Sequence, residues 1–263
     1  MARALAIVLW LITLVSVVLM SGRHGWFPEQ ISEYGDAIDR QFVVTLIVVG
    51  IAFVLAQVTL GYFVLRYRDR GSGQAVYTHG HTGLEVAAMV VTAVVFVILA
   101  FMGQRVWAQL HLSEAPPDAF QVEVTGQQFV WNIRYPGADG KFGPTKPELI
   151  NDQENPVGID RSDPTAKDDV VSVNRMAIPV NRPVLVWLRA KDVTHSFYVP
   201  ALRLKQDTVP GMRLSIHFQA RKAGQFEIAC AELCGLGHYR MKGFLEVMSD
   251  SELDAWLKER ASY

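Results

Sequence analysis

The chain has little charge, few cysteines and no repetition. Charged residues make up 19% of its 263 residues, and the formal net charge is -1. A near-neutral chain without a basic stripe argues against a nucleic-acid partner. No CxxCH run occurs, so no haem domain is fused to it. We find no internal repeat and no low-complexity tract. The only two cysteines lie four residues apart, which places all the thiol chemistry in a single loop.

That loop reads Cys230-Ala-Glu-Leu-Cys234-Gly-Leu-Gly-His238-Tyr-Arg-Met241 and offers two thiols, an imidazole and a thioether. Soft sulfur ligands select copper over harder metals, and a thiolate, imidazole and weak methionine set is typical of electron-transfer copper. A one-copper blue site needs a single cysteine. The second cysteine therefore lets both sulfurs bridge two metal ions. A second imidazole must come from elsewhere, and His195 is the candidate.

Two other interpretations account for the cysteines alone. Oxidising compartments favour a disulfide, but a disulfide leaves His238 and Met241 unexplained. A zinc site with two cysteines and two histidines usually has a CxxC knuckle and no methionine. His195 by itself is more often a satisfied strand histidine, and Met241 by itself is more often core packing. Only the complete set favours copper.

The run CAELCGLGHYRM resembles the CuA loop of cytochrome c oxidase subunit II, whose pattern is CxExCxxxHxxM, and every defined position is filled. Upstream, the segments His195–Pro200 and Lys205–Gly211 are similar to the family's HSFxVP and KxDxxPG segments. The resemblance covers about two-thirds of the chain, including the membrane hairpin described below.

The resemblance implies a dinuclear copper centre with a defined ligand set. Cys230 and Cys234 would bridge the two coppers. The remaining ligands would be His195 and Met241 for one metal, and His238 and the backbone carbonyl of Glu232 for the other. In the family, the side chain of this glutamate also faces a magnesium ion at the boundary with the catalytic subunit. From the bare sequence, Glu232 is equally a solvated loop acid.

Two apolar stretches predict a transmembrane hairpin over residues 41–108. Residues 41–65 carry no charge, residues 84–107 are charged only near their ends, and each exceeds the ~20 residues that cross a bilayer. The connection carries Arg66, Arg68 and Arg70, and arginines in a short loop mark the cytoplasmic side. The remaining chain, 109–263, is therefore expected outside the cytoplasm, anchored in the cell (inner) membrane.

Residues 1–20 are expected to be a signal peptide or a first transmembrane helix. A positive start at Arg3 followed by an apolar run fits both, but no AxA cleavage site follows, which favours an uncleaved anchor.

An acid at the end of a membrane helix is a functional candidate. Glu85, with His79 and His81 just before it, lies at the expected cytoplasmic end of the second hairpin helix. By the resemblance, Glu85 would mark the entrance of a proton path into the catalytic subunit. The alternative is an interfacial acid that anchors the helix end.

From Asp118 onward, short alternating or apolar runs separated by Pro and Gly predict β-strands. The fold class is therefore a membrane-anchored all-β protein: N-terminal transmembrane helices followed by a cupredoxin-like Greek-key barrel or sandwich. Ser249 and Glu252 form the pattern of a capping box, which predicts a short helix through Lys258. The expected strands are 120–124, 170–174, 184–188, 214–218, 226–229 and 244–247.

Acidic residues are in surplus in the loop-rich insertion 136–169. Acid on a donor-facing surface steers a basic cytochrome by long-range attraction, although most surface acid only solvates. By the resemblance, Asp207 is a further docking candidate.

An aromatic cluster follows the first strand. In the family, a tryptophan there is the proposed point where electrons enter. Aligned on Gly126-x-Gln, this chain has Phe129 at that position and Trp131 two residues later. Both residues are candidates for the entrance, and core packing is the alternative for each.

Together these features predict subunit II of a haem-copper respiratory oxidase. It would accept electrons from a c-type cytochrome at CuA and pass them to the haem of catalytic subunit I, which reduces oxygen to water. The alternatives are the CuA subunit of a nitric oxide reductase, or a membrane copper-delivery or scaffold protein.

Overall fold

A computed structural model of the chain describes residues 1–22, 26–71, 73–74, 77 and 79–261. The chain divides into two compact units. A helical unit comprises Met1–Phe27 and Ala37–Val106, and a β unit comprises Pro28–Asp36 and Trp107–Tyr263.

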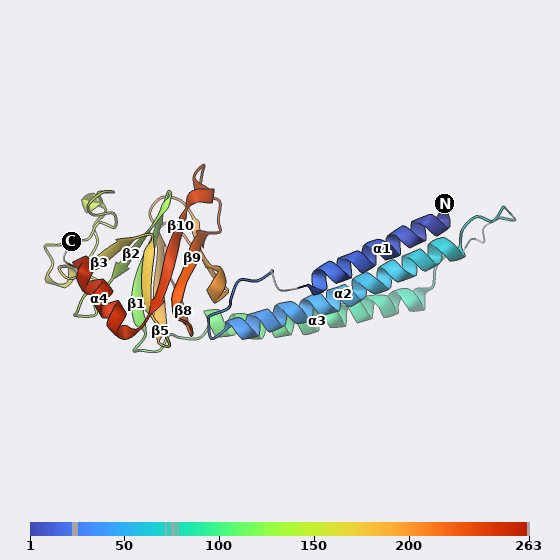
Figure 1. Cartoon of the computed structure of the whole chain (residues 1–263), viewed down its shortest axis with the longest axis horizontal. Coiled ribbons are helices and arrows are strands. Elements are labelled where there is room, and N and C mark those ends of the chain that lie inside the picture. The colour runs from blue at the N-terminus through green and yellow to red at the C-terminus, as the bar shows by residue number, and fades with distance from the viewer. Residues whose placement is uncertain (23–25, 72, 75–76, 78, 262–263) are drawn as a thin grey trace. The chain divides into compact units, whose positions relative to one another are not determined.

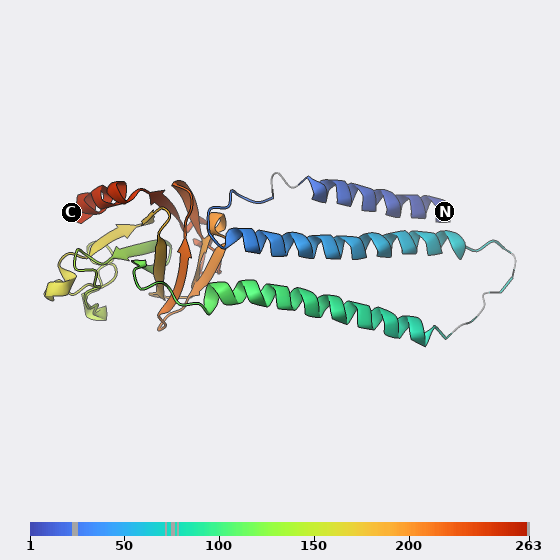
Figure 2. The same ribbon diagram turned by 90° about the horizontal axis from the view of Figure 1, so that it is seen from below.

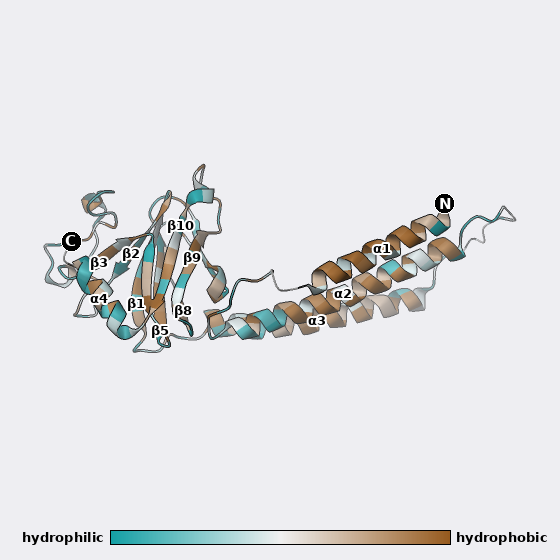
Figure 3. Ribbon diagram, viewed as in Figure 1, coloured by the Kyte–Doolittle hydropathy of each residue, from teal (hydrophilic) through white to brown (hydrophobic). Residues whose placement is uncertain are grey.

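The helical unit is built from three long helices, α1 (Ala2–Ser21), α2 (Gly35–Arg66) and α3 (Thr82–His111). Figure 1 and Figure 2 both place α2 between α1 and α3. All three are long and apolar enough to cross a membrane, and apolar residues cover most of their length in Figure 3. The predicted spans 41–65 and 84–107 lie inside α2 and α3.

Helix α1 packs closely against α2 at one point. A side chain at Gly61 would lie 2.4 Å from the indole nitrogen of Trp10, so only glycine leaves room for this ring. Ala6 in the same helix is fully buried. That residues 1–20 stay in the mature protein as an uncleaved anchor remains a prediction.

The β unit is a sandwich of two five-stranded sheets, which confirms the predicted cupredoxin-like all-β fold with N-terminal apolar helices. The first sheet has the order β3-β2-β1-β5-β8 and the second β4-β10-β9-β6-β7. Strands β1 and β5 pair in parallel, as do β4 and β10; the other neighbours are antiparallel. The strands are β1 (Phe120–Gln127), β2 (Val130–Tyr135), β3 (Val170–Val173), β4 (Arg175–Pro179), β5 (Pro183–Ala190), β6 (His195–Val199), β7 (Leu204–Thr208), β8 (Leu214–Gln219), β9 (Gly224–Cys230) and β10 (Lys242–Met248).

The core lies between the two sheets, where alternate side chains of each strand point inward. Its largest members include Trp131, Tyr135, Phe197 and Phe218, all almost completely buried. All six predicted strands lie within or overlap observed ones. The sequence did not predict β2, β4, β6 and β7, and β7 (Leu-Lys-Gln-Asp-Thr) is mostly polar.

The segment Pro28–Asp36, which runs into the first residues of α2, belongs to the β unit. The backbone of Ile31 donates a hydrogen bond to Ala201 (2.9 Å) and accepts one from Arg221 (2.7 Å). Its side chain is 1% exposed. No sequence pattern predicts this contact, because a single apolar residue between polar neighbours has no periodicity.

The chain ends in helix α4 (Asp250–Ala261), three residues longer than predicted. Its capping box is formed: the backbone N–H of Ser249 donates to Glu252 (2.9 Å), and the N–H of Glu252 donates to the Ser249 hydroxyl (3.4 Å).

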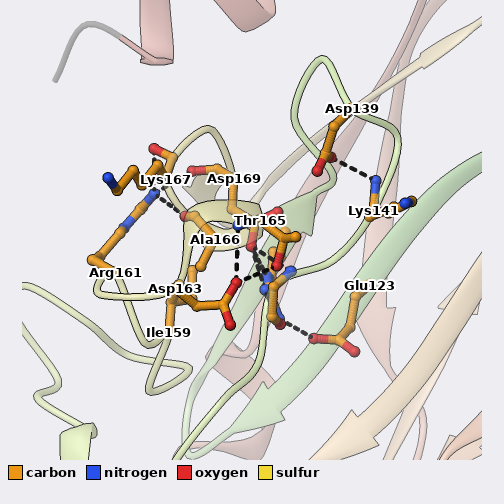
Figure 4. Close-up of polar contacts among 12 residues, drawn as sticks. Glu123, Asp139, Lys141, Ile159, Arg161, Asp163, Thr165, Ala166, Lys167 and Asp169 are labelled. Carbon is orange, nitrogen blue, oxygen red and sulfur yellow. Dashed lines mark hydrogen bonds and ion pairs between the residues drawn. The ribbon is translucent and has the colours of Figure 1, made fainter.

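The acidic insertion is fixed to the first sheet by a buried arginine. Arg134 on β2 pairs with Asp169, donates to the Gly143 carbonyl (2.6 Å) and lies 3.5 Å from Glu123. Arg161 donates to the backbone carbonyls of residues 166, 167 and 169 (Figure 4). Short 3-10 turns at Pro147–Leu149 and Pro164–Ala166 complete the insertion, which is therefore an ordered part of the domain.

Asp160 holds one turn of this insertion. Its carboxylate pairs with Lys146 (2.6 Å) and accepts hydrogen bonds from the hydroxyl (2.5 Å) and N–H (3.1 Å) of Ser162. The lysine and these hydrogen bonds lower the pKa of Asp160 to about 2.

We expect Asp160→Asn to lower the thermal midpoint of the β unit near neutral pH. A depressed folded-state pKa contributes stability above the unfolded value of 3.8, and this stability is lost as the pH falls toward about 2. The difference between variant and wild type should therefore shrink between pH 5 and about 2. Near-ultraviolet circular dichroism of the detergent-solubilised full chain measures it, with the exposed Glu154→Gln as control. A difference that does not change with pH would contradict the assignment.

Candidate metal centre

The two segments that carry the sulfur and imidazole groups meet at one end of the second sheet. His195 begins β6, and Cys230 ends the neighbouring strand β9. The register pairs Phe197 with Cys230, and the N–H of Ala231 continues the pairing to the carbonyl of Ser196 (3.0 Å). Residues distant in the sequence are thus brought together by strand pairing.

Cys230 lies against two of the predicted ligand atoms. Its Sγ is 4.0 Å from Nδ1 of His195 and 3.2 Å from the backbone carbonyl of Glu232. The Sγ of Cys234 is 3.8 Å away, and both thiols are free.

Cys234 lies against the other two. Its Sγ is 3.6 Å from Nδ1 of His238 and 3.7 Å from Sδ of Met241. A 3-10 turn over His238–Arg240 and a left-handed glycine, Gly235 (φ +129°), fold the loop back on itself. The N–H of Cys230 then donates to the carbonyl of Met241 (3.2 Å), which closes the loop.

Most of the site is buried. His195 is 0% exposed, Cys234 and Met241 are 2% and Cys230 is 9% exposed, while His238 is half-buried. Burial, together with the adjacent Cys230, raises the pKa of the Cys234 thiol to about 11. Two thiols held together in an apolar interior ionise readily only when a cation compensates their charge.

The donor set fits a soft metal. The ligand atoms of His195, Cys230 and Cys234 all lie within 4.8 Å of one another. Two thiol sulfurs, two imidazole nitrogens and one thioether sulfur match copper rather than magnesium or calcium, which take oxygen ligands.

The Glu232 side chain is exposed, in contrast to the sulfur ligands. In the part of the chain that the structure describes, no second group of three metal-binding side chains includes its carboxylate. The magnesium ion therefore stays a prediction that needs oxygen ligands from another subunit.

Both candidate aromatic residues lie next to the site. Phe129 is half-buried, and a side chain at Gly237 would approach its ring to 2.4 Å, so Phe129 covers the cysteine loop. Trp131 is fully buried in the core and meets the ring of His195 edge-on, with centroids 6.1 Å apart.

Two further predicted residues belong to other elements than the metal-binding side chains. Glu85 is exposed in the first turn of α3. Asp207 lies on the edge strand β7, half-exposed, and pairs with Lys205 (3.0 Å).

Sequence reasoning missed two polar residues that touch this site, Gln128 and Asp192. The side chain of Gln128 reaches the carbonyl of Cys234, and the carboxylate of Asp192 reaches Nε2 of His195. A carboxylate three residues before a ligand histidine is the one sequence signal that points to Asp192. Nothing local points to Gln128.

Comparison with known proteins matches the whole region that contains the site. The family profile described as "Cytochrome C oxidase subunit II, periplasmic domain" matches residues 120–248. A crystal structure of the periplasmic domain of subunit II of cytochrome oxidase from Bradyrhizobium japonicum is 29% identical, covers 57% of this chain and 98% of its own, and gives a TM-score of 0.42.

Two curated relatives extend the match over the helices. "Alternative cytochrome c oxidase subunit 2" of Bradyrhizobium diazoefficiens is 36% identical over 261 residues, which cover 99% of this chain and 93% of the relative. "Cytochrome c oxidase subunit 2" of Cereibacter sphaeroides is 29% identical over 231 residues, covering 81% and 73%. The chain belongs to the cytochrome c oxidase subunit II family.

Proposed function

We propose that this subunit of a cytochrome c oxidase holds a dinuclear copper centre, CuA, and transfers single electrons from a c-type cytochrome to the haem of catalytic subunit I. Cys230 and Cys234 would bridge the two metals. His195 and Met241 would complete one, and His238 and the carbonyl of Glu232 the other.

One observation carries this proposal: each thiol lies beside one residue that would bind the first metal and one that would bind the second. Cys230 is next to His195 of the first metal and the Glu232 carbonyl of the second. Cys234 is next to Met241 of the first and His238 of the second. This crossed arrangement is what two bridging sulfurs require, and a site for one metal does not need it.

When bound, the copper pair supplies one-electron transfer without large changes in bond length. The residues of the chain keep it in an apolar interior and exclude water, because three of the ligand side chains are at most 2% exposed. The same burial argues against a copper-delivery protein, whose site has to release its metal.

The position of Phe129 supports the proposal that electrons enter on the exposed side of the cysteine loop. Its half-buried ring lies over the cysteine loop, whereas Trp131 is inaccessible to a partner. We therefore propose that the electron donor contacts Phe129. Trp131 lies between the hydrophobic core and His195, where the donor does not reach it.

The acidic side chains of the β unit favour an electron donor with a basic surface, because they are held in fixed positions. The exposed acids of the insertion, among them Glu148 and Asp152, are carried by a loop that Arg134 anchors, and Asp207 adds a carboxylate on edge strand β7. Charges on an ordered surface give a defined docking field, which is weakened by salt.

The helical unit fits the membrane anchor. Three apolar helices and the arginines at the end of α2 favour a β unit on the extracytoplasmic side of the cell membrane. His81 caps α3 by accepting a hydrogen bond from the N–H of Leu84 (3.1 Å). Glu85, the next residue, is exposed, and we propose that it marks the entrance of a proton path.

Copper content and electron paramagnetic resonance of the full chain, purified in detergent and loaded with copper, test the centre. We expect about two coppers per chain. They should share one unpaired electron, seen as hyperfine splitting from two equivalent nuclei. Cys234→Ser should abolish that pattern. One copper, zinc, or a metal-free disulfide in the wild type would contradict the proposal.

Gly126 provides a second test, because β1 passes very close to the ring of His195. A side chain at this position would lie 2.8 Å from Cδ2 of His195 and 3.2 Å from the Thr208 hydroxyl. We expect Gly126→Ala to displace the imidazole and weaken copper retention against a chelator. Gly50→Ala, where a side chain would meet nothing within 4 Å, is the matched control. Equal retention in both variants would remove His195 from the ligand set.

A further inference from the structure

The turn between β1 and β2 contacts both metal-binding segments at once. Asp192, three residues before His195, accepts the backbone N–H of Gln128 at 2.8 Å through Oδ2. The side-chain amide of Gln128 donates to the carbonyl of Cys234 at 2.5 Å. A continuous chain of hydrogen bonds thus runs from the histidine segment, through the turn, to the cysteine loop.

Asp192 also fixes the orientation of the imidazole. Its Oδ1 lies 2.8 Å from Nε2 of His195 and accepts the N–H of Val193 at 2.7 Å. Because a carboxylate only accepts, Nε2 carries the hydrogen and Nδ1 presents its lone pair toward Cys230, 4.0 Å away. The ring is therefore already aimed at the sulfur pair.

The ring of Phe129 reinforces the same turn. It packs against Gly235 and Gly237, where an added side chain would approach it to 3.4 Å and 2.4 Å. Gly235 would also bring a side chain within 2.7 Å of the Gln128 amide. The cysteine loop needs glycine at both positions to fit beneath the turn.

We propose that Asp192 and Gln128 act as one brace that holds His195 and the cysteine loop in their metal-binding arrangement before any metal arrives. Both are positioning residues, since neither supplies a ligand atom. The proposal rests on the metal centre proposed above, but it makes a separate statement about the metal-free chain: the brace keeps the two thiols buried.

Gln128→Glu is the sharpest variant, because it keeps the shape and replaces the donor amide by a carboxylate that repels the Cys234 carbonyl. The exposed Gln153→Glu makes the same change of charge elsewhere and is the control. In the reduced, metal-free full chain in detergent, iodoacetamide should alkylate the cysteines of Gln128→Glu about two- to tenfold faster than those of the control.

Copper retention gives the second measurement. Removing a group that orients a metal ligand typically costs about 10- to 100-fold in affinity, so Gln128→Glu and Asp192→Asn should each lose copper to a competing chelator within that range. If the two residues form one unit, the double variant should lose little more than the weaker-binding single variant. Asp192→Asn should also raise the midpoint potential, because the imidazole becomes a poorer donor.

The outcomes separate the two proposals. Faster alkylation in Gln128→Glu without a dinuclear signal in the wild type would leave the brace standing and overturn the copper centre. Alkylation and copper retention equal to those of Gln153→Glu would overturn the brace and leave the copper centre intact. Losses that simply add in the double variant would show two independent contacts, which also overturns the single brace.

Discussion

The pairing of β6 with β9 is the constraint on which the site depends. It places Phe197 opposite Cys230 and so puts His195 beside the cysteine loop. Because side chains alternate along a strand, a shift of one residue would turn His195 out of the interior and move Phe197 out of the core. The arrangement of the candidate ligands and the hydrophobic core are therefore specified by the same register.

Two polar networks stabilise the β unit in addition to its strand pairing. At the site, Asp192 and Gln128 connect the turn between β1 and β2 to both the histidine segment and the cysteine loop. On the outer face of the first sheet, buried Arg134 neutralises Asp169 and holds the insertion. Buried charges are tolerated only when they are paired and hydrogen-bonded, and this arginine meets both conditions. The acidic insertion of this chain is thus attached to the sandwich by buried side-chain contacts.

The sequence was most informative where function depends on local spacing. The loop from Cys230 to Met241 shows its ligands within a few residues of one another, and the capping box at Ser249 is equally local. His195 was a candidate only because the cysteine loop lacks a second imidazole, since nothing in its own segment distinguishes a ligand from a strand histidine. Ile31 and Gln128 were beyond prediction, since their partners, Ala201 and Cys234, are remote in the sequence. Polar strand β7 was missed because it lacks the apolar alternation that marks a half-buried strand.

The antiparallel pairing of β2 with β3 closes the whole insertion into one loop, because Tyr135 at its start pairs with Val170 at its end. The entropy lost on closing a flexible loop grows only with the logarithm of its length, about 0.6 kcal/mol for each doubling. Changes in the length of the insertion therefore cost little folding free energy, provided that the Arg134 anchor remains. The acidic surface can therefore change in extent without altering the β6–β9 register that places His195 beside the cysteine loop.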